Sequence, residues 1–164
     1  MNQATSFGGP FVLMPKRLLD KWVESMGGVP DPEIGLYGEV CSEQSLMHVI
    51  RFEGAEIVRL AEEPSDLFWL PSELGGIVVQ WMGADSAEQL LAYGEKIADE
   101  AKWDEELEFE VKESDLVLMD SCGFEGDGQP KIEISLSAGS YKIEAVYSES
   151  ETVADTVFRI RKKE

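Results

Sequence analysis

The sequence predicts an α+β fold, in which an N-terminal α+β lobe with short strands and two main helices is followed by an antiparallel β-sheet or small β-sandwich lobe. In residues 1–104, apolar residues recur at both helical and strand spacing, whereas from Leu107 onward they recur with a period of two. The 164 residues also suffice to bury a hydrophobic core. We therefore expect lobes at 1–104 and 105–164, packed together as one compact unit.

The N-terminal lobe is expected to begin with a strand and a helix. The apolar run Pro10–Met14 follows a glycine pair, which is typical of a strand that leaves a turn. Pro15 suits the first position of a helix, and the apolar positions within Leu18–Val23 recur at helical spacing. Gly27–Gly28 is expected to end this helix. Val29–Gly38 is rich in proline, glycine and aspartate, so we expect a loop there.

A hairpin and a central strand are expected next. The apolar runs Leu46–Phe52 and Ala55–Leu60 flank a short turn at Glu53–Gly54, which predicts a β-hairpin. Leu67–Pro71 is apolar but bounded by prolines, so we expect an ordered loop or a short edge strand. Ile77–Met82 is the most β-branched run in the chain and is expected to lie in the centre of a sheet.

The clearest helix signal covers about residues 86–101. Ser86 can cap the N-terminus of this helix, and Gln89 follows three residues later, as in a capping box. Beyond the helix, Ala138–Ser140 is expected to be a hairpin turn among five short strands separated by Gly, Ser and Asp. These strands are expected at Leu107–Val111, Leu116–Met119, Ile132–Leu136, Tyr141–Tyr147 and Val157–Ile160.

The charge of the chain limits its partners. There are 33 acidic and 14 basic residues, which give a net charge of −19. Because binding to phosphate groups needs a basic surface, this balance argues against nucleic-acid and anionic-membrane partners. No apolar run is long enough for a transmembrane helix. A basic protein partner would be attracted by the negative charge, which is concentrated in residues 61–110 with fourteen acids and two cations.

Histidine and cysteine are scarce, and the 33 acidic residues are too many for any pair of them to indicate a catalytic site. His48 is the single histidine, and no nucleophile or carboxylate stands beside it in a catalytic pattern. Cys41 and Cys122 match no motif of a nucleophile, a disulfide framework or a zinc site, which fits reduced thiols in a cytoplasmic protein. We therefore expect no catalytic residue, no cofactor and no metal.

One acidic loop leaves an alternative open. Asp120, Glu125 and Asp127 are interspersed with glycines, and calcium prefers several oxygen ligands. The spacing does not match that of an EF-hand loop. We expect Asp120–Gly128 to be a turn between strands, and calcium binding there stays open.

Residues that bind a partner are expected where acids gather around the end of the second main helix. Acids at a helix C-terminus oppose the macrodipole, which indicates a use other than stability, although a solvated face that keeps the protein soluble is the alternative. Aromatic side chains are the other candidates: among them Trp69, in its proline-bounded segment, is the one we most expect to be partly exposed, and a place in the hydrophobic core is the alternative. The candidates are Glu95, Asp99, Glu100, Asp104, Glu105, Glu106, Trp69 and Trp103.

Three blocks of the sequence carry a resemblance to a known family. Ser6–Trp22 contains a GGP turn, an apolar strand, a proline and a short helix that ends in tryptophan. Glu62–Ser86 contains proline, tryptophan, a glycine pair and an apolar strand that leads to a second tryptophan. The third block has Asp120–Ser121 followed by a Gly–x–Tyr pair at Gly139 and Tyr141. In this order the blocks resemble the bacterial immunity protein 21 family, which accompanies polymorphic toxin systems.

The resemblance implies a cytoplasmic, non-catalytic protein that neutralises a cognate toxin by binding it. It implies no catalytic residues. The acidity of the chain adds the expectation that the toxin domain is basic. A small cytoplasmic regulatory or ligand-binding module is the alternative function, and the product of the adjacent gene would distinguish the two.

Overall fold

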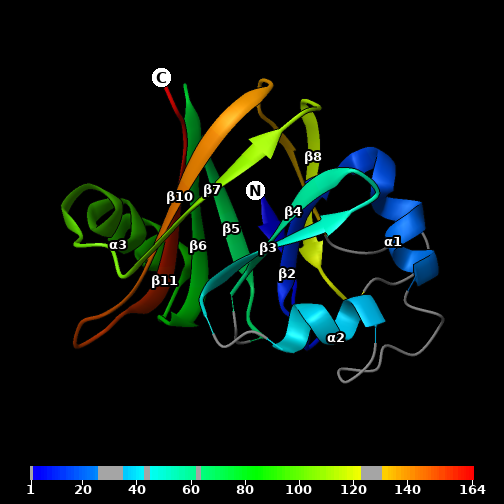
Figure 1. Cartoon of the computed structure of the whole chain (residues 1–164). Coiled ribbons are helices and arrows are strands. Elements are labelled where there is room, and N and C mark those ends of the chain that lie inside the picture. Colours follow the sequence, from blue (N-terminus) through cyan, green and yellow to red (C-terminus); the bar gives the residue numbers. More distant parts are fainter. Residues whose placement is uncertain (1, 26–34, 43–44, 62–63, 123–130) are drawn as a thin grey trace.

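The computed structural model describes residues 2–25, 35–42, 45–61, 64–122 and 131–164, and within them it shows an α+β fold with two antiparallel sheets (Figure 1). The predicted fold class is confirmed. The six-stranded sheet consists, in spatial order, of β1 (Gln3–Ala4), β5 (Leu67–Ser72), β6 (Gly75–Gly83), β11 (Ala154–Lys162), β10 (Gly139–Glu149) and β7 (Glu105–Val111). The five-stranded sheet consists of β3 (Met47–Phe52), β4 (Ala55–Leu60), β2 (Phe11–Pro15), β8 (Asp115–Asp120) and β9 (Ile132–Ser135).

Helices cover the outer face of each sheet. A short 3-10 turn, η1 (Lys16–Leu18), leads into α1 (Leu19–Ser25), and Trp22 of α1 packs with Val40 of α2 (Gly35–Ser42) in the apolar cluster over the five-stranded sheet. The third helix, α3 (Ala87–Glu100), packs on β6 and β11 of the six-stranded sheet. Figure 1 shows α3 and the pair α1 and α2 on opposite sides of the molecule. None of the described helices is long and apolar enough to span a membrane.

The main hydrophobic core lies between the two sheets. Phe11 and Val58 from the five-stranded sheet pack in one cluster with Val78, Phe158 and other residues from the six-stranded sheet. Because successive side chains of a strand point to opposite faces, every second residue of these strands enters this cluster. In the C-terminal strands this alternation corresponds to the period of two in the sequence.

Each sheet contains strands from both segments of the chain. In the six-stranded sheet β6 pairs with β11, and in the five-stranded sheet β2 pairs with β8. Backbone hydrogen bonds therefore link residues before and after position 104 in both layers. We still expect the two segments to unfold as one unit.

The N-terminus of α3 has the cap residue that the sequence predicts. The Ser86 hydroxyl accepts a hydrogen bond from the Gln89 backbone N–H at 3.2 Å, which satisfies one of the free donors of the first turn. The Gln89 side chain accepts from the Asp85 N–H rather than from the cap residue, so the reciprocal bond of the capping box is shifted by one residue. Leu90, Gly94 and Ala98 form the buried stripe of the helix.

The expected hairpin is confirmed as β3 and β4, and the expected central strand is confirmed as β6. The five expected C-terminal strands are confirmed as β7 to β11. Part of the expected loop at 29–38 is wrong, because residues 35–38 belong to α2, while 29–34 and the helix-ending Gly27–Gly28 lie outside the described residues. Burial of Val40 against the sheet stabilises α2 despite its two glycines.

Two further expectations are corrected. β5 is a strand but not the edge of its sheet, since β1 pairs with Leu67 and Phe68, and Pro71 lies beyond β1. The expected hairpin turn at Ala138–Ser140 is wrong: β9 pairs with β8 in one sheet, while β10 pairs with β7 and β11 in the other. The chain crosses between the layers at this point, a step that depends on distant strand partners.

Candidate functional site

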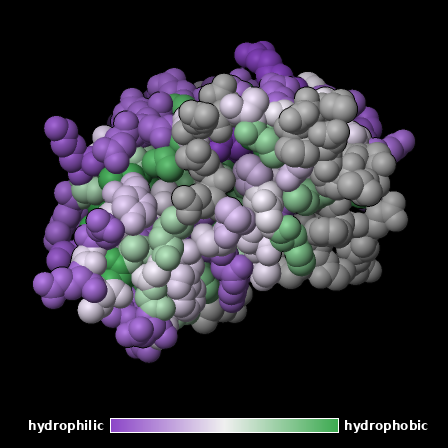
Figure 2. Space-filling model, turned by 90° about the horizontal axis from the view of Figure 1, so that it is seen from below, coloured by the Kyte–Doolittle hydropathy of each residue, from purple (hydrophilic) through white to green (hydrophobic). Residues whose placement is uncertain are grey.

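The predicted acidic cluster lies partly on α3 and partly on β7. Glu95, Asp99 and Glu100 are exposed on the last turns of α3, and Asp104 is exposed in the connection to β7. Figure 2 shows hydrophilic side chains crowded along the side of the molecule on which α3 lies in Figure 1, with smaller hydrophobic patches between them. The fold therefore brings the first four predicted acids to one side of the protein.

The acids of β7 have partners within the protein. A carboxylate oxygen of Glu105 accepts a hydrogen bond from the Leu46 backbone N–H at 2.7 Å, beside the start of β3. The Glu106 carboxylate forms an ion pair with Lys142 of β10 at 2.9 Å. Glu105 thus satisfies a backbone donor next to an edge strand, so part of its role is structural.

The acids of α3 differ in this respect. Within the part of the chain that the structure describes, Glu95, Asp99 and Glu100 take part in no ion pair. They lie near the helix C-terminus, where the partial charge of the helix is negative and no basic residue of the last turn offsets it. These carboxylates are available to an external cation.

The two predicted tryptophans have different environments. Trp69 is buried in the core between the sheets with 5% of its surface exposed, so the expectation of partial exposure is wrong. Gly76 makes room for the ring, because a Cβ at that position would lie 2.5 Å from Trp69 Cη2. Trp103 is half-buried, and the Arg159 guanidinium lies 4.5 Å from the centre of its ring. Only Trp103 offers surface to a partner.

A buried carboxylate organises the cations on the outer face of the six-stranded sheet. Glu144 accepts hydrogen bonds from Arg159 at 2.9 and 2.6 Å and from Arg161 at 3.2 Å, and it forms an ion pair with Lys142 at 3.1 Å. Burial alone would raise the pKa of the Glu144 carboxyl, but the hydrogen bonds from Arg159 and Lys142 lower it below its ordinary value. This network lies next to the C-terminal half of α3, since Arg159 also donates to the Ala98 carbonyl at 3.0 Å.

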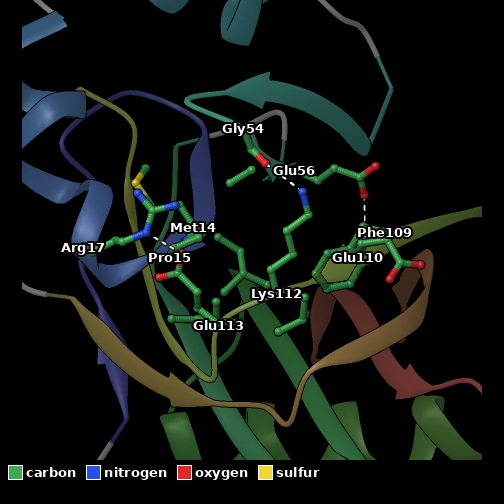
Figure 3. Close-up of a pocket in the computed structure, with 13 residues that line it drawn as sticks. Met14, Pro15, Arg17, Gly54, Glu56, Phe109, Glu110, Lys112 and Glu113 are labelled. Atoms are coloured by element: carbon green, nitrogen blue, oxygen red, sulfur yellow. Dashed lines mark hydrogen bonds and ion pairs between the residues drawn. The ribbon is translucent and has the colours of Figure 1, made fainter.

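A cavity at one end of the sandwich is too small for a substrate. It has a volume of about 20 Å³, roughly the space of one water molecule. Figure 3 shows Lys112 reaching across it to the Gly54 carbonyl, to which it donates at 3.1 Å, and the Glu110 N–H donating to Glu56 at 2.7 Å. An ion pair between Arg17 and Glu113 lies at its side. These bonds tie the ends of the two sheets together.

The residues that carry the family resemblance have structural roles. The fully buried Asp120 carboxylate accepts hydrogen bonds from the backbone N–H groups of Phe7, Gly9 and Cys122 at 2.7, 3.2 and 2.8 Å. A Cβ on Gly9 would lie 2.6 Å from this carboxylate, so only glycine fits the turn. Asp120 thereby joins the N-terminal GGP turn to the end of β8.

Other motif residues extend the same framework. The Trp22 indole N–H donates to the Ser121 carbonyl at 2.9 Å, which fixes α1 to the end of β8. The Tyr141 hydroxyl donates to the Ser137 carbonyl at 2.8 Å where the chain enters β10. These motif residues therefore hold the fold together.

Among the residues that the structure describes, the cysteines and the histidine form no catalytic arrangement. Burial raises the pKa of the Cys122 thiol to about 11, and it also raises the pKa of the Cys41 thiol, so neither favours a reactive thiolate at neutral pH. The Tyr37 hydroxyl lies 3.0 Å from Cys122 Sγ. His48 lies on β3 opposite Arg59 of β4.

The calcium interpretation is untested. Glu125 and Asp127 lie outside the described residues, and the Asp120 carboxylate is occupied by backbone N–H groups. The described residues contain no group of three or more His, Cys, Asp or Glu side chains placed to hold a metal ion.

Comparison with known proteins gives one match. A family model described as Immunity protein 21 matches residues 3–154. The match covers every strand up to β10 and the three helices, including all three sequence blocks. No curated protein and no solved structure matches the chain.

Proposed function

The chain belongs to the immunity protein 21 family, and from this premise we propose that it binds and neutralises a cognate bacterial toxin domain without catalysing a reaction. The family match over residues 3–154 is the observation that carries the proposal. The sequence around His48, Cys41 and Cys122 matches no catalytic motif, which supports the proposal, because neutralisation by binding requires a surface rather than a reactive group.

The partner that fits the charge of this protein is a basic toxin domain of a polymorphic toxin system. Negative charge on α3 and its C-terminal connection attracts a cationic protein over long distances and speeds association. Trp103 lies beside these acids and offers apolar area, a property of residues that dominate binding energy. We place this encounter in the cytoplasm, and a nucleic acid or a membrane does not fit the charge.

The test uses the C-terminal domain of the protein encoded by the adjacent gene. We expect a stable complex in which the activity of that domain is lost at equimolar ratio. Neutralising two acids, as Glu100→Gln with Asp104→Asn, should slow association severalfold and weaken its dependence on salt, because the attractive field is reduced.

The matched control is Asp115→Asn with Glu133→Gln, which removes the same charge from exposed positions on the five-stranded sheet. Stopped-flow kinetics at two ionic strengths measure the association rate of each double variant with the toxin domain. Absence of a complex would refute the proposed function. Equal effects of the two pairs would show that the acids of α3 contribute only to overall charge.

A further inference from the structure

The carboxyl of Asp155 lies between the six-stranded sheet and α3. Asp155 is fully buried on β11, a strand that lies between β6 and β10. Its Oδ2 lies 3.4 Å from the position that a Cβ on Gly94 would take, so the middle of α3 closes directly over the carboxyl. Among the residues that the structure describes, neither oxygen has a hydrogen-bond partner. A carboxyl in this setting favours its neutral form, because a buried charge without a partner is costly.

The neighbours of Asp155 on its own face of the sheet are uncharged. In the strand register it lies opposite Trp81 of β6 and Ser148 of β10, and side chains that lie opposite each other share a face. The titratable group that α3 places on this face is Tyr93, whose hydroxyl lies 2.8 Å from the Ser148 hydroxyl. These two hydroxyls therefore bond to each other rather than to the carboxyl.

The charged groups of the same elements leave the carboxyl uncompensated. Arg159, farther along β11, is bound by Glu144 of β10. The charged side chains of α3 are exposed to solvent, and they are Glu88, Glu95, Lys96, Asp99 and Glu100. Burial is the only cause that raises the pKa of the Asp155 carboxyl, to about 7, so none of these charges offsets the cost of ionising it.

The position of α3 lets it move without opening the main core. Leu90 packs with Val79 in one small apolar cluster, and Ala98 packs with Val157 in another. Within the described part of the chain, the core between the two sheets contains no residue of α3. Because β11 is held by a strand on each side, displacement of the helix is the least costly way for water to reach the carboxyl.

We propose that α3 is a pH-sensitive cover, which closes on the sheet over a protonated Asp155, and that loss of this proton favours an open form in which both sheets stay folded. Between about pH 4 and about pH 7 the closed form keeps a proton that the open form has lost, so opening becomes roughly tenfold more favourable per pH unit. Above about pH 7 both forms are ionised, and the dependence on pH levels off. This opening is a property of the fold and does not depend on the proposed function.

Native-state hydrogen exchange of the full chain measures the opening. Dividing the exchange rate of an unstructured chain at the same pH by the observed rate of each backbone amide gives a protection factor. For the amides of residues 91–98 we expect this factor to fall roughly 30–100-fold from pH 5 to pH 8. It should also be at least about tenfold lower than at the β10–β11 pair and nearly insensitive to low urea, because local opening exposes little surface.

Two variants assign the pH dependence to Asp155. Asp155→Asn cannot ionise, so the protection factors of its α3 amides should stay constant from about pH 5 to about pH 8. Asp99→Asn removes a carboxyl from an exposed position on α3 and should keep the wild-type profile. Titration of the Asp155 carboxyl by carbon NMR in the wild-type protein needs no variant, and we expect its midpoint at about pH 7.

Three results would overturn the inference. They are a midpoint at about pH 4, the ordinary value for aspartate, protection of α3 equal to that of the sheet, or the same pH dependence in Asp155→Asn as in the wild type. The proposed function is judged separately, by formation of the complex with the domain encoded next door.

Discussion

Asp155 is a fully buried carboxyl on β11, beneath α3. Neither of its side-chain oxygens has a hydrogen-bond partner among the described residues, and Oδ2 lies 3.4 Å from the position that a Cβ on Gly94 would take. Burial raises the pKa of the Asp155 carboxyl to about 7. The folded protein therefore retains a proton on this group over a pH range in which the unfolded chain, with an aspartate pKa of about 4, has lost it.

The consequence is a loss of stability as the pH rises. Between about pH 4 and about pH 7 the folded state binds more protons at Asp155 than the unfolded state, so this group makes the free energy of unfolding fall across that window. Asp155→Asn cannot ionise, so its stability relative to the wild type should increase by ~2–3 kcal/mol from about pH 5 to about pH 8. Urea unfolding across this range measures the difference, and Asp115→Asn, at an exposed site, is the control. Parallel pH profiles for Asp155→Asn and the wild type would contradict the prediction.

Asp120 is the residue on which the N-terminal turn depends. Its Oδ2 accepts from Phe7 and Gly9, and its Oδ1 accepts from Cys122. In Asp120→Asn, whichever way the amide is turned, its NH₂ group faces a backbone donor, so at least one buried or partly buried N–H loses its acceptor.

We expect Asp120→Asn to lower the free energy of unfolding by ~2–3 kcal/mol, the cost of buried polar groups left unpaired. Chemical denaturation measures it. The comparison is Glu133→Gln, which breaks an exposed ion pair with Lys16 and should cost less than about 1 kcal/mol. Similar losses in the two variants would mean that Asp120 does not hold the turn.

Among the secondary-structure elements, those that are marked by nearby residues, such as a turn glycine or a helix cap, could be predicted from the sequence. The hairpin of β3 and β4 has apolar runs around a glycine turn, and α3 has a cap residue and a buried stripe. Elements that depend on distant partners could not. α2 forms because a sheet buries Val40, β5 gains a neighbour from residues 3–4, and the chain crosses to the other layer before β10. No spacing within the sequence encodes such pairings.

The close packing of α3 on the sheet restricts which residue the helix can carry at position 94. Gly94 lies over Val79 of β6, and a Cβ at Gly94 would lie 2.7 Å from Val79 Cγ2. Gly94→Ala improves helix propensity by about 1 kcal/mol, but it forces the helix away from the sheet. We expect a net destabilisation of ~1–2 kcal/mol from overpacking. Thermal unfolding measures it, and in a Val79→Ala background the same change should cost less or become stabilising, since the clash is removed. Equal effects in both backgrounds would disprove the clash.

At the scale of the whole molecule, the clustering of acids along the sequence predicted the exposed acids of α3, but it did not predict that acids of β7 have partners within the protein. The acids of α3 could be located from their sequence neighbourhood, because a helix keeps near residues together. The hydrogen bond from Leu46 to Glu105 and the ion pair of Glu106 with Lys142 depend on how the strands are arranged, which the sequence does not show. A groove lined by Glu95, Leu70 and Ile77 likewise forms only when β5, β6 and β11 are aligned. Burial of Trp69 likewise follows from the packing of two sheets rather than from its flanking prolines.

The arrangement of strands predicts that residues 105–164 cannot fold alone. In this fragment β11 loses β6 and β8 loses β2, so each sheet ends in a new unpaired edge and most of the partners of the shared core are absent. A piece of this size is marginal even with a complete core. We therefore expect the fragment to show no cooperative melting transition by circular dichroism, whereas its coexpression with residues 1–104 should yield a complex, because the missing strands restore both sheets. A soluble fragment 105–164 that melts as cooperatively as the full chain would show instead that the C-terminal strands form an independent domain.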